Sequence, residues 1–423
     1  MSNAMRDNQA MQLLKGHRFR LDLAESQAEF CSRTAGICRF LRNLALEQRS
    51  MAWKHGKHSV GYNAQAGELS DLKALAPWVA EAPHHCLQQV LRDLQVAFQN
   101  FFAGRAAYPA FQKKFAHDSF RFPDPKQFQV DEVRQRIKLP KLGWVPYRNG
   151  KGRHALKLQG TIKSITVSRE GKHWFISILC EAEVAEPVPV LGPAVGIDLG
   201  VAQTITLSSG QEPIQVPGMT KAESCRLARI QRAFARKRRG SANRAKARTR
   251  LAEFQARIAR RRRDAVHKAT TMLAKSHSLV VIEDLRIKSM TKAPEPKPDP
   301  DKEGSFLPNG AAAKAGLNKA ILDKGWGEIR RQLEYKCRWY GSKLVAVPPA
   351  YTSQRCSAPG CGHTEEGNRT SQAEFRCLKC GHAENADLNA AKNILSKGTT
   401  DGPSVSACGA RALAGRRSRK VAA

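Results

Sequence analysis

The stretch of sequence that decides the fold reads Ala194-Val195-Gly196-Ile197-Asp198-Leu199-Gly200-Val201. Its apolar run, closed by an acid and a glycine, predicts a buried strand that ends in a tight turn. Residues 204–210 predict the strand that returns from this turn. Asp198 then has two interpretations: it is a structural residue that shapes the corner between strand and turn, or it is a functional acid at the end of the strand.

Two further acids stand at the ends of apolar elements. Glu283 closes a second buried strand within 278–285, and Asp387 lies at the start of a helix predicted near 385–395. Taken singly, Glu283 could be an exposed strand end and Asp387 a helix N-cap. Apolar strands rarely end on acids in a chain with 71 Lys and Arg but only 37 Asp and Glu. We therefore expect Asp198, Glu283 and Asp387 to form one site.

Three carboxylates gathered in this way can hold two divalent ions about 3.5–4 Å apart, which activate a water and stabilise the leaving oxygen of a phosphodiester. Hard oxygen ligands select Mg²⁺ or Mn²⁺ rather than zinc. Asp284 is the alternative to Glu283, because strand alternation lets only one of the two adjacent acids face the ions.

Four of the eleven cysteines form two pairs, Cys356-x4-Cys361 and Cys377-x2-Cys380, separated by fifteen residues. This is the spacing of a zinc ribbon, and the glycines of each pair allow the tight turns that aim two thiolates at one ion. We expect one structural zinc ion. His363 and His382 are alternative ligands, although surface positions suit them better. The other cysteines are isolated and expected to act mostly as small core residues: Cys31, Cys38, Cys86, Cys180, Cys225, Cys337 and Cys408.

The formal net charge is +34, and hydrophobic residues make up 41% of the chain. This indicates a folded protein whose self-repulsion is relieved by a polyanion, and nucleic acid is the obvious partner. Residues 221–263 are helical in period and carry seventeen Lys or Arg against only Glu223 and Glu253. Either this segment lies along a phosphate backbone or it is a solvated surface. Within it we predict phosphate contacts from Arg236, Lys237, Arg238 and Arg239.

The rest of the chain divides by its periodicity. Strand-like alternation in the first twenty or so residues and in 109–185 predicts one barrel, with a helical segment of about 26–104 inserted into it. A proline-rich linker follows at 186–193. No run approaches the ~18 apolar residues of a membrane span and no secretion signal is evident, so we expect a soluble protein that is neither secreted nor bound to a membrane.

The motifs around the three acids resemble the three RuvC motifs of TnpB, the transposon-encoded RNA-guided endonuclease related to compact type V CRISPR effectors. They read Gly196-Ile197-Asp198-Leu199-Gly200, Val281-Ile282-Glu283-Asp284-Leu285 and Ala386-Asp387-Leu388-Asn389-Ala390-Ala391. Tyr108–Phe115 and Tyr351–Ser357 also resemble family segments, so the similarity covers nearly the whole chain. The x4 spacing of the first cysteine pair is a mild departure.

The resemblance implies an α/β multidomain protein with a division of the chain into five parts. These are a wedge-like β-barrel (5–25 and 105–190), an inserted helical recognition lobe (26–104), an RNase H-like RuvC nuclease domain (191–350 and 384–397), an inserted zinc ribbon that binds target nucleic acid (351–383), and a basic tail expected to be disordered (398–423).

The resemblance also implies the activity and its partners. They are a guide RNA made from the transposon end, double-stranded target DNA, a short target-adjacent motif, and cleavage of both strands by one metal-dependent site. The resemblance also implies a location in the bacterial cytosol, associated with the nucleoid. Protein partners stay unknown. Two alternatives remain: a nuclease-inactive guided DNA-binding regulator, which the intact acids disfavour, and a guide-independent RNase H-like nuclease, which the large insertions disfavour.

Overall fold

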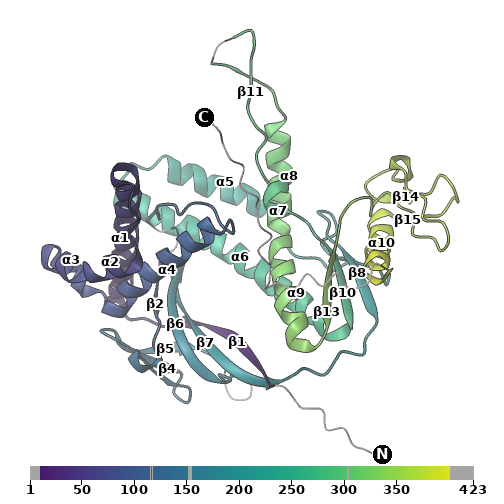
Figure 1. Ribbon diagram of the computed structural model, residues 1–423. Helices are drawn as coiled ribbons and strands as arrows, with labels where there is room; N and C mark the ends of the chain where they lie inside the picture. The colour runs from purple at the N-terminus through teal and green to yellow at the C-terminus, as the bar shows by residue number, and fades with distance from the viewer. Residues whose placement is uncertain (1–9, 115, 117, 151–154, 303, 401–423) are drawn as a thin grey trace, which may run out of the picture. The chain divides into compact units, whose positions relative to one another are not determined.

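The computed structural model describes residues 10–114, 116, 118–150, 155–302 and 304–400 (Figure 1). The start of the first predicted strand segment, Cys408 and most of the predicted basic tail lie outside these ranges. By compactness the chain forms two units. The first comprises Met1–Glu186 and Leu227–Ala256, and the second comprises Pro187–Arg226 and Arg257–Ala423.

The first unit contains a seven-stranded sheet of order β2-β6-β7-β1-β5-β4-β3, in which the pairings are antiparallel. The strand-like segments at the N-terminus and after residue 109 thus join one sheet. The polar, glycine-containing turn within 167–176 predicts a hairpin. It is present between β6 and β7, and Gly171 turns it with a φ of 63°. The strands are β1 (Ala10–Leu21), β2 (Ser119–Phe122), β3 (Gln129–Asp131), β4 (Arg136–Leu139), β5 (Gly143–Arg148), β6 (Thr161–Glu170) and β7 (His173–Ala185).

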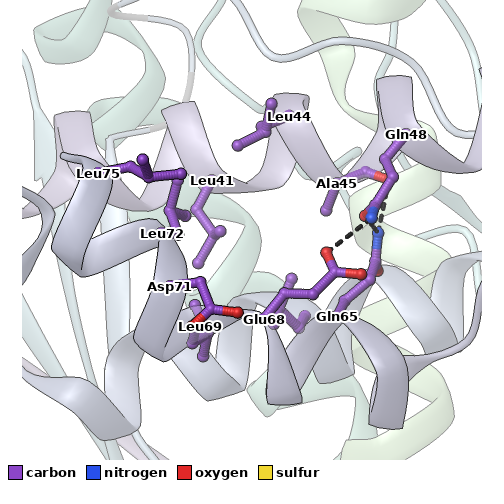
Figure 2. Close-up of a pocket in the computed structure, with 11 residues that line it drawn as sticks. Leu41, Leu44, Ala45, Gln48, Gln65, Glu68, Leu69, Asp71, Leu72 and Leu75 are labelled. Carbon is purple, nitrogen blue, oxygen red and sulfur yellow. Dashed lines mark hydrogen bonds between the residues drawn. The ribbon is translucent and has the colours of Figure 1, made fainter.

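Helices fill the interval between β1 and β2, as the periodicity predicts. Leu87, Leu91, Leu94 and Phe98 form a buried stripe along one of them, α4. A pocket of about 330 Å³ opens between α1 and the short helices α2 and α3, and leucines line most of it (Figure 2). The helices are α1 (Glu25–Gly56), α2 (Tyr62–Gly67), α3 (Leu69–Leu75), the 3-10 turn η1 (Pro77–Glu81) and α4 (His84–Phe102), with η2 (Pro125–Gln127) after β2.

The second unit is organised by a four-stranded sheet of order β13-β10-β8-β9. The strands predicted at 194–201 and 278–285 lie in it, and so does the apolar run Lys343-Leu344-Val345-Ala346-Val347. Strand β10 is parallel to β8 and β13, whereas β9 is antiparallel to β8. The bounds are β8 (Ala194–Asp198), β9 (Thr206–Leu207), β10 (Leu279–Glu283) and β13 (Lys343–Val347).

Helix α10 (Ala386–Thr400) lies directly against this sheet, beside β8 and β10 (Figure 1). Two glycines make the approach possible. A Cβ atom on Gly196 would lie 2.1 Å from the carbonyl oxygen of Ala391, and one on Gly398 would lie 2.5 Å from Val281 Cγ1. Any side chain at these positions would push the helix off the strands. Residues 398–400 complete this helix, so the predicted boundary at 398 is wrong, and the rest of the predicted tail lies outside the described residues.

Apolar residues recur at helical spacing from Leu322 to Tyr340, namely Leu322, Trp326, Ile329, Leu333, Cys337 and Tyr340. This spacing predicts one continuous helix, and the prediction is wrong. Gly325 adopts a left-handed conformation with a φ of 72°, which separates α8 from α9 and leaves Leu322 56% exposed. The remaining helices and short elements are α5 (Lys221–Ala235), α6 (Ala242–Ser276), α7 (Ile287–Met290), β11 (Lys297–Pro298), β12 (Phe306–Leu307), α8 (Ala311–Lys324), α9 (Trp326–Tyr340), η4 (Glu366–Asn368), β14 (Glu374–Arg376) and β15 (Ala383–Asn385).

The basic segment 221–263 is divided between the two units. Its central part, Leu227–Ala256, clusters with the first unit, whereas the sequence-based division kept 191–350 together. Among the helices that the structure describes, none is both long and apolar enough to span a membrane.

Candidate active site and metal centre

The ends of β8 and β10 bring Asp198 and Glu283 next to each other. The parallel register pairs Ile197 with Ile282, so the acids that follow these residues lie on neighbouring strands, about 4.8 Å apart in backbone spacing. Ile197 and Ile282 belong to the core that packs against α6 and α9. Because side chains alternate, Asp198 and Glu283 lie on the opposite face, where α10 packs.

Asp387 reaches the same place from the first turn of α10. It is not the helix cap, since the side chain of Asn385 accepts hydrogen bonds from the backbone amides of Asp387 (3.0 Å) and Leu388 (3.2 Å). Asp387 Oδ2 lies 3.7 Å from the position of a Cβ on Gly200, two residues after Asp198. The three predicted acids therefore converge where β8, β10 and α10 meet.

Asp284 lies on the other side of β10. Its carboxylate pairs with the guanidinium of Arg330 on α9 and is more than half exposed. Strand alternation thus gives the predicted assignment, with Glu283 toward the other two acids and Asp284 away from them.

The electrostatics of the three carboxylates are those of a site short of positive charge. Burial, followed by repulsion from Glu283 and then from Asp387, raises the pKa of Asp198 to about 7. Burial also raises the pKa of Glu283 and of Asp387. Partly buried carboxylates, two of which repel the third, are the donor set that a hard divalent cation stabilises.

Two residues that the sequence analysis did not single out contact these acids. The hydroxyl of Thr352 donates to Glu283 Oε1 at 2.5 Å, and Arg369 Nη2 lies 3.5 Å from Asp387 Oδ1. The hydrogen bond from Thr352 lowers the pKa of Glu283, and the positive charge of Arg369 lowers the pKa of Asp387. Burial raises both pKa values and is the larger effect. Both residues belong to the predicted zinc-ribbon segment, so that segment borders the acids.

The four paired cysteines are gathered around one point. Their sulfur atoms all lie within 4.8 Å of one another, with Cys356 and Cys380 3.6 Å apart and Cys361 and Cys377 3.7 Å apart. Four sulfurs placed tetrahedrally about zinc at ~2.3 Å would be about 3.8 Å apart. Burial raises the pKa of Cys377, but hydrogen bonds from the backbone amides of Cys380 and Lys379 and from the neighbouring cysteine side chains outweigh it and lower the pKa to about 6. The group could hold a zinc ion.

The two candidate histidine ligands point elsewhere. His363 Nε2 pairs with Glu365 at 2.9 Å and His382 Nε2 with Glu384 at 3.0 Å, while their backbone carbonyls accept hydrogen bonds from Cys356 and Cys377. Both histidines are half-buried and are built into the turns around the cysteines, so they differ from the surface residues that the sequence analysis preferred. Five of the isolated cysteines are buried, and Cys225 is exposed.

Arg236, Lys237, Arg238 and Arg239 form an exposed connection between α5 and α6. The turn is fixed through its backbone, because Arg244 Nη1 donates to the Lys237 carbonyl at 2.6 Å and Ser241 Oγ to the Arg238 carbonyl at 2.9 Å. Four cationic side chains are thus presented on an ordered turn.

Comparison with known proteins gives the class first. Three family models match: "Cas12f1-like, TNB domain" over 326–394, "Probable transposase" over 177–293 and "Helix-turn-helix domain" over 11–58. Over 11–58 the structure has strand β1 followed by the single long helix α1, not two helices joined by a turn. The fold is similar to that in the "Cryo-EM structure of the Cas12f1-sgRNA-target DNA complex", with a TM-score of 0.51, 17% identity, and coverage of 88% of this chain and 82% of that chain.

Two relatives then give the family. "Putative RNA-guided DNA endonuclease InsQ" of Escherichia coli (strain K12) is 41% identical over 410 residues, 96% of this chain and 96% of that protein. A "Putative RNA-guided DNA endonuclease" of Streptomyces pristinaespiralis is 34% identical over 414 residues, 94% of this chain and 92% of that protein. This chain belongs to the TnpB family of RNA-guided DNA endonucleases, as its motifs indicated.

Proposed function

We propose that this chain is an RNA-guided DNA endonuclease of a transposable element. It binds a guide RNA from the transposon end, pairs it with double-stranded target DNA beside a short adjacent motif, and hydrolyses phosphodiester bonds in both strands at one site. The observation that carries the proposal is the convergence of Asp198, Glu283 and Asp387 on one side of the β8–β10 sheet. The family relationship supplies the class of substrate.

Asp198, Glu283 and Asp387 are the proposed ligands of two Mg²⁺ or Mn²⁺ ions, which would supply an activated water and stabilise the leaving oxygen of the phosphodiester. Burial, followed by repulsion from Glu283 and Asp387, raises the pKa of Asp198, so a bound cation would stabilise its ionised form. Arg369 partly neutralises Asp387. Asp284, paired with Arg330, takes no part.

The RuvC domain is proposed to be RNase H-like. In support, β9 and β8 are antiparallel, β10 and β13 continue in parallel on the other side, and an isolated antiparallel bridge joins Ile205 to Ile214 beyond β9. The seven-stranded sheet of the first unit would be the wedge-like barrel, and its inserted helices the recognition lobe that reads the adjacent motif.

The cysteine group is proposed to hold one structural zinc ion, because a ribbon with so few large apolar residues needs metal binding to fold. Arg236, Lys237, Arg238 and Arg239 are proposed to contact nucleic-acid phosphates. Sequence specificity would come from base pairing, while contacts of this kind hold the heteroduplex.

Co-expression with the flanking transposon end tests the proposal. The purified protein should carry a discrete RNA, and replacing the guide portion of that RNA should redirect cleavage of a plasmid library to the new target in Mg²⁺. Guided binding without cutting would instead indicate the regulator, and cutting that survives removal of RNA would indicate a guide-independent nuclease. Either result contradicts the proposal.

A further inference from the structure

Thr352 is a buried polar residue of the proposed zinc ribbon that contacts a proposed metal ligand. It is 3% exposed, and its hydroxyl oxygen lies 2.5 Å from Glu283 Oε1 and 2.9 Å from the carbonyl oxygen of Pro349. A hydroxyl has one hydrogen to donate, and an ionised carboxylate is the stronger acceptor of the two. The distance to Glu283 is that of a charge-assisted O–H···O⁻ bond.

The backbone around Thr352 is fixed by the helix that carries Asp387. Asn393 of α10 donates to the carbonyl oxygens of Thr352 (3.0 Å) and Arg355 (2.6 Å). One turn earlier, Asn389 donates to the Arg355 carbonyl at 2.8 Å and accepts from the Ser357 amide at 2.9 Å. Both asparagines are buried. Thr352 is therefore held rigidly relative to α10.

Glu283 needs such support more than the two aspartates do. Its side chain has one more rotatable bond, and rotation about it moves the carboxylate relative to Asp198. A hydrogen bond on Oε1 fixes the plane of the carboxylate and leaves Oε2 for another partner. Groups that orient metal ligands in this way commonly change metal affinity or activity 10–100-fold when they are removed.

We propose that Thr352 is a positioning residue for the nuclease site: its hydroxyl orients the Glu283 carboxylate for divalent-cation binding and so links the start of the ribbon to the metal site. The inference rests on the proposed function. It assigns to this threonine a role that is separate from folding the ribbon, whose zinc ligands begin at Cys356.

The test compares Thr352→Val, which removes the hydroxyl, with Thr352→Ser, which keeps it. Mn²⁺ binding to the full-length protein freed of nucleic acid is measured by calorimetry, with the heat that Asp198→Ala still shows subtracted as background. Mg²⁺ dependence of guided cleavage is measured in parallel. We expect Thr352→Val to weaken Mn²⁺ binding by ~10–100-fold and to raise the Mg²⁺ concentration for half-maximal cleavage by a similar factor. Thr352→Ser should stay within about 3-fold of wild type in both measurements.

Thr364→Val is the matched control, because Thr364 is an exposed ribbon residue whose hydroxyl bonds to the Gly362 carbonyl. Thr364→Val should match wild type in Mn²⁺ affinity and in the Mg²⁺ dependence of cleavage. Zinc content and guided DNA binding should be unchanged in all three variants. If Thr352→Val loses zinc, Thr352→Ala takes its place in the comparison with Thr352→Ser, because alanine also removes the hydroxyl and its side chain is smaller than that of valine.

Wild-type Mn²⁺ affinity in Thr352→Val would overturn the inference. Equal impairment of Val and Ser would also overturn it, because packing and not the hydroxyl would then be responsible. Both outcomes presuppose a wild-type protein that cuts its guided target. A wild-type protein that does not cut would instead be a failure of the proposed function.

Discussion

The two candidate metal centres of the second unit are assembled in opposite ways. The four cysteines come from one short segment, and their sulfurs are already within 4.8 Å of one another. The three acids come from two strands and a helix far apart in the chain, and in the described part of the chain the cysteines are the group gathered closely enough for a single ion. The proposed structural site is thus closed by local turns, whereas the proposed catalytic site is held together by the global fold.

The largest effect is expected from the acids. Asp198→Ala, Glu283→Ala and Asp387→Ala should each reduce guided cleavage by at least about 10³-fold and leave guided DNA binding largely intact, because the metal ligands act as a unit. Double variants should be no worse than single ones. Plasmid cleavage and a gel-shift assay measure the two properties.

Asp284→Ala is the control for this prediction, since its carboxylate adjoins Glu283 in sequence but pairs with Arg330. It should still cut. An inactive Asp284→Ala beside an active Glu283→Ala would reverse the assignment of the two acids, and substantial cutting by any one of the three acid variants would remove that residue from the site.

Loss of a cysteine should act locally. Cys377→Ser should lower zinc content from one ion per chain to well below one and unfold the ribbon, because metal binding supplies its folding energy. The first unit should keep its thermal transition. Elemental analysis and proteolysis of the ribbon measure the effect, and the absence of zinc from wild-type protein purified without chelator would contradict the assignment.

The basic turn should contribute sequence-independent affinity. Replacing Arg236, Lys237, Arg238 and Arg239 together should flatten the slope of log affinity against log salt by up to ~3 to 4, since each lost phosphate contact changes it by ~0.9. The weakening should be equal for all guides and targets. Equal slopes for wild type and variant would make the turn ordinary surface, and a loss limited to one target would mean that it reads bases.

The smallest effect concerns pH in the absence of Mg²⁺. The pKa of Asp198 is about 7 in the folded chain against an ordinary value of 3.8, so the folded state holds a proton that the unfolded state releases between these values. The free energy of unfolding should therefore fall as pH rises from about 4 to 7. The corresponding shift in melting temperature is on the order of 10 °C at most.

Asp198→Asn is the comparison for the pH prediction, because an amide in the same place does not titrate. The difference in melting temperature between wild type and this variant should grow with pH, and Mg²⁺ should reduce it. A difference that is constant from pH 5 to pH 8 would show that the carboxylate is not under the strain that its neighbours impose.

The sequence predicts the acids and the cysteines for different reasons. The acids stand out because strand ends are visible as apolar runs, and the alternation of Glu283 and Asp284 follows from the pleat. The cysteines stand out through spacing alone. Thr352 and Arg369 leave no such trace, because their contacts depend on how a ribbon returns to a sheet edge. The break at Gly325 was missed because the apolar period continues across it.

The domain division shows the same limit. Helical period and charge identify 221–263 as one segment, but they do not show that Leu227–Ala256 packs with the first unit. Such clustering depends on which apolar side chains the segment buries and not on its average composition.

The most direct test of the central account is anomalous scattering from Mn²⁺ in crystals of the protein with guide RNA and a target DNA whose scissile phosphate carries a non-hydrolysable substitution. The account predicts two peaks about 4 Å apart among Asp198, Glu283 and Asp387, with the scissile phosphate beside them. No peak at these three carboxylates, or a peak coordinated by Asp284 in place of Glu283, would contradict it.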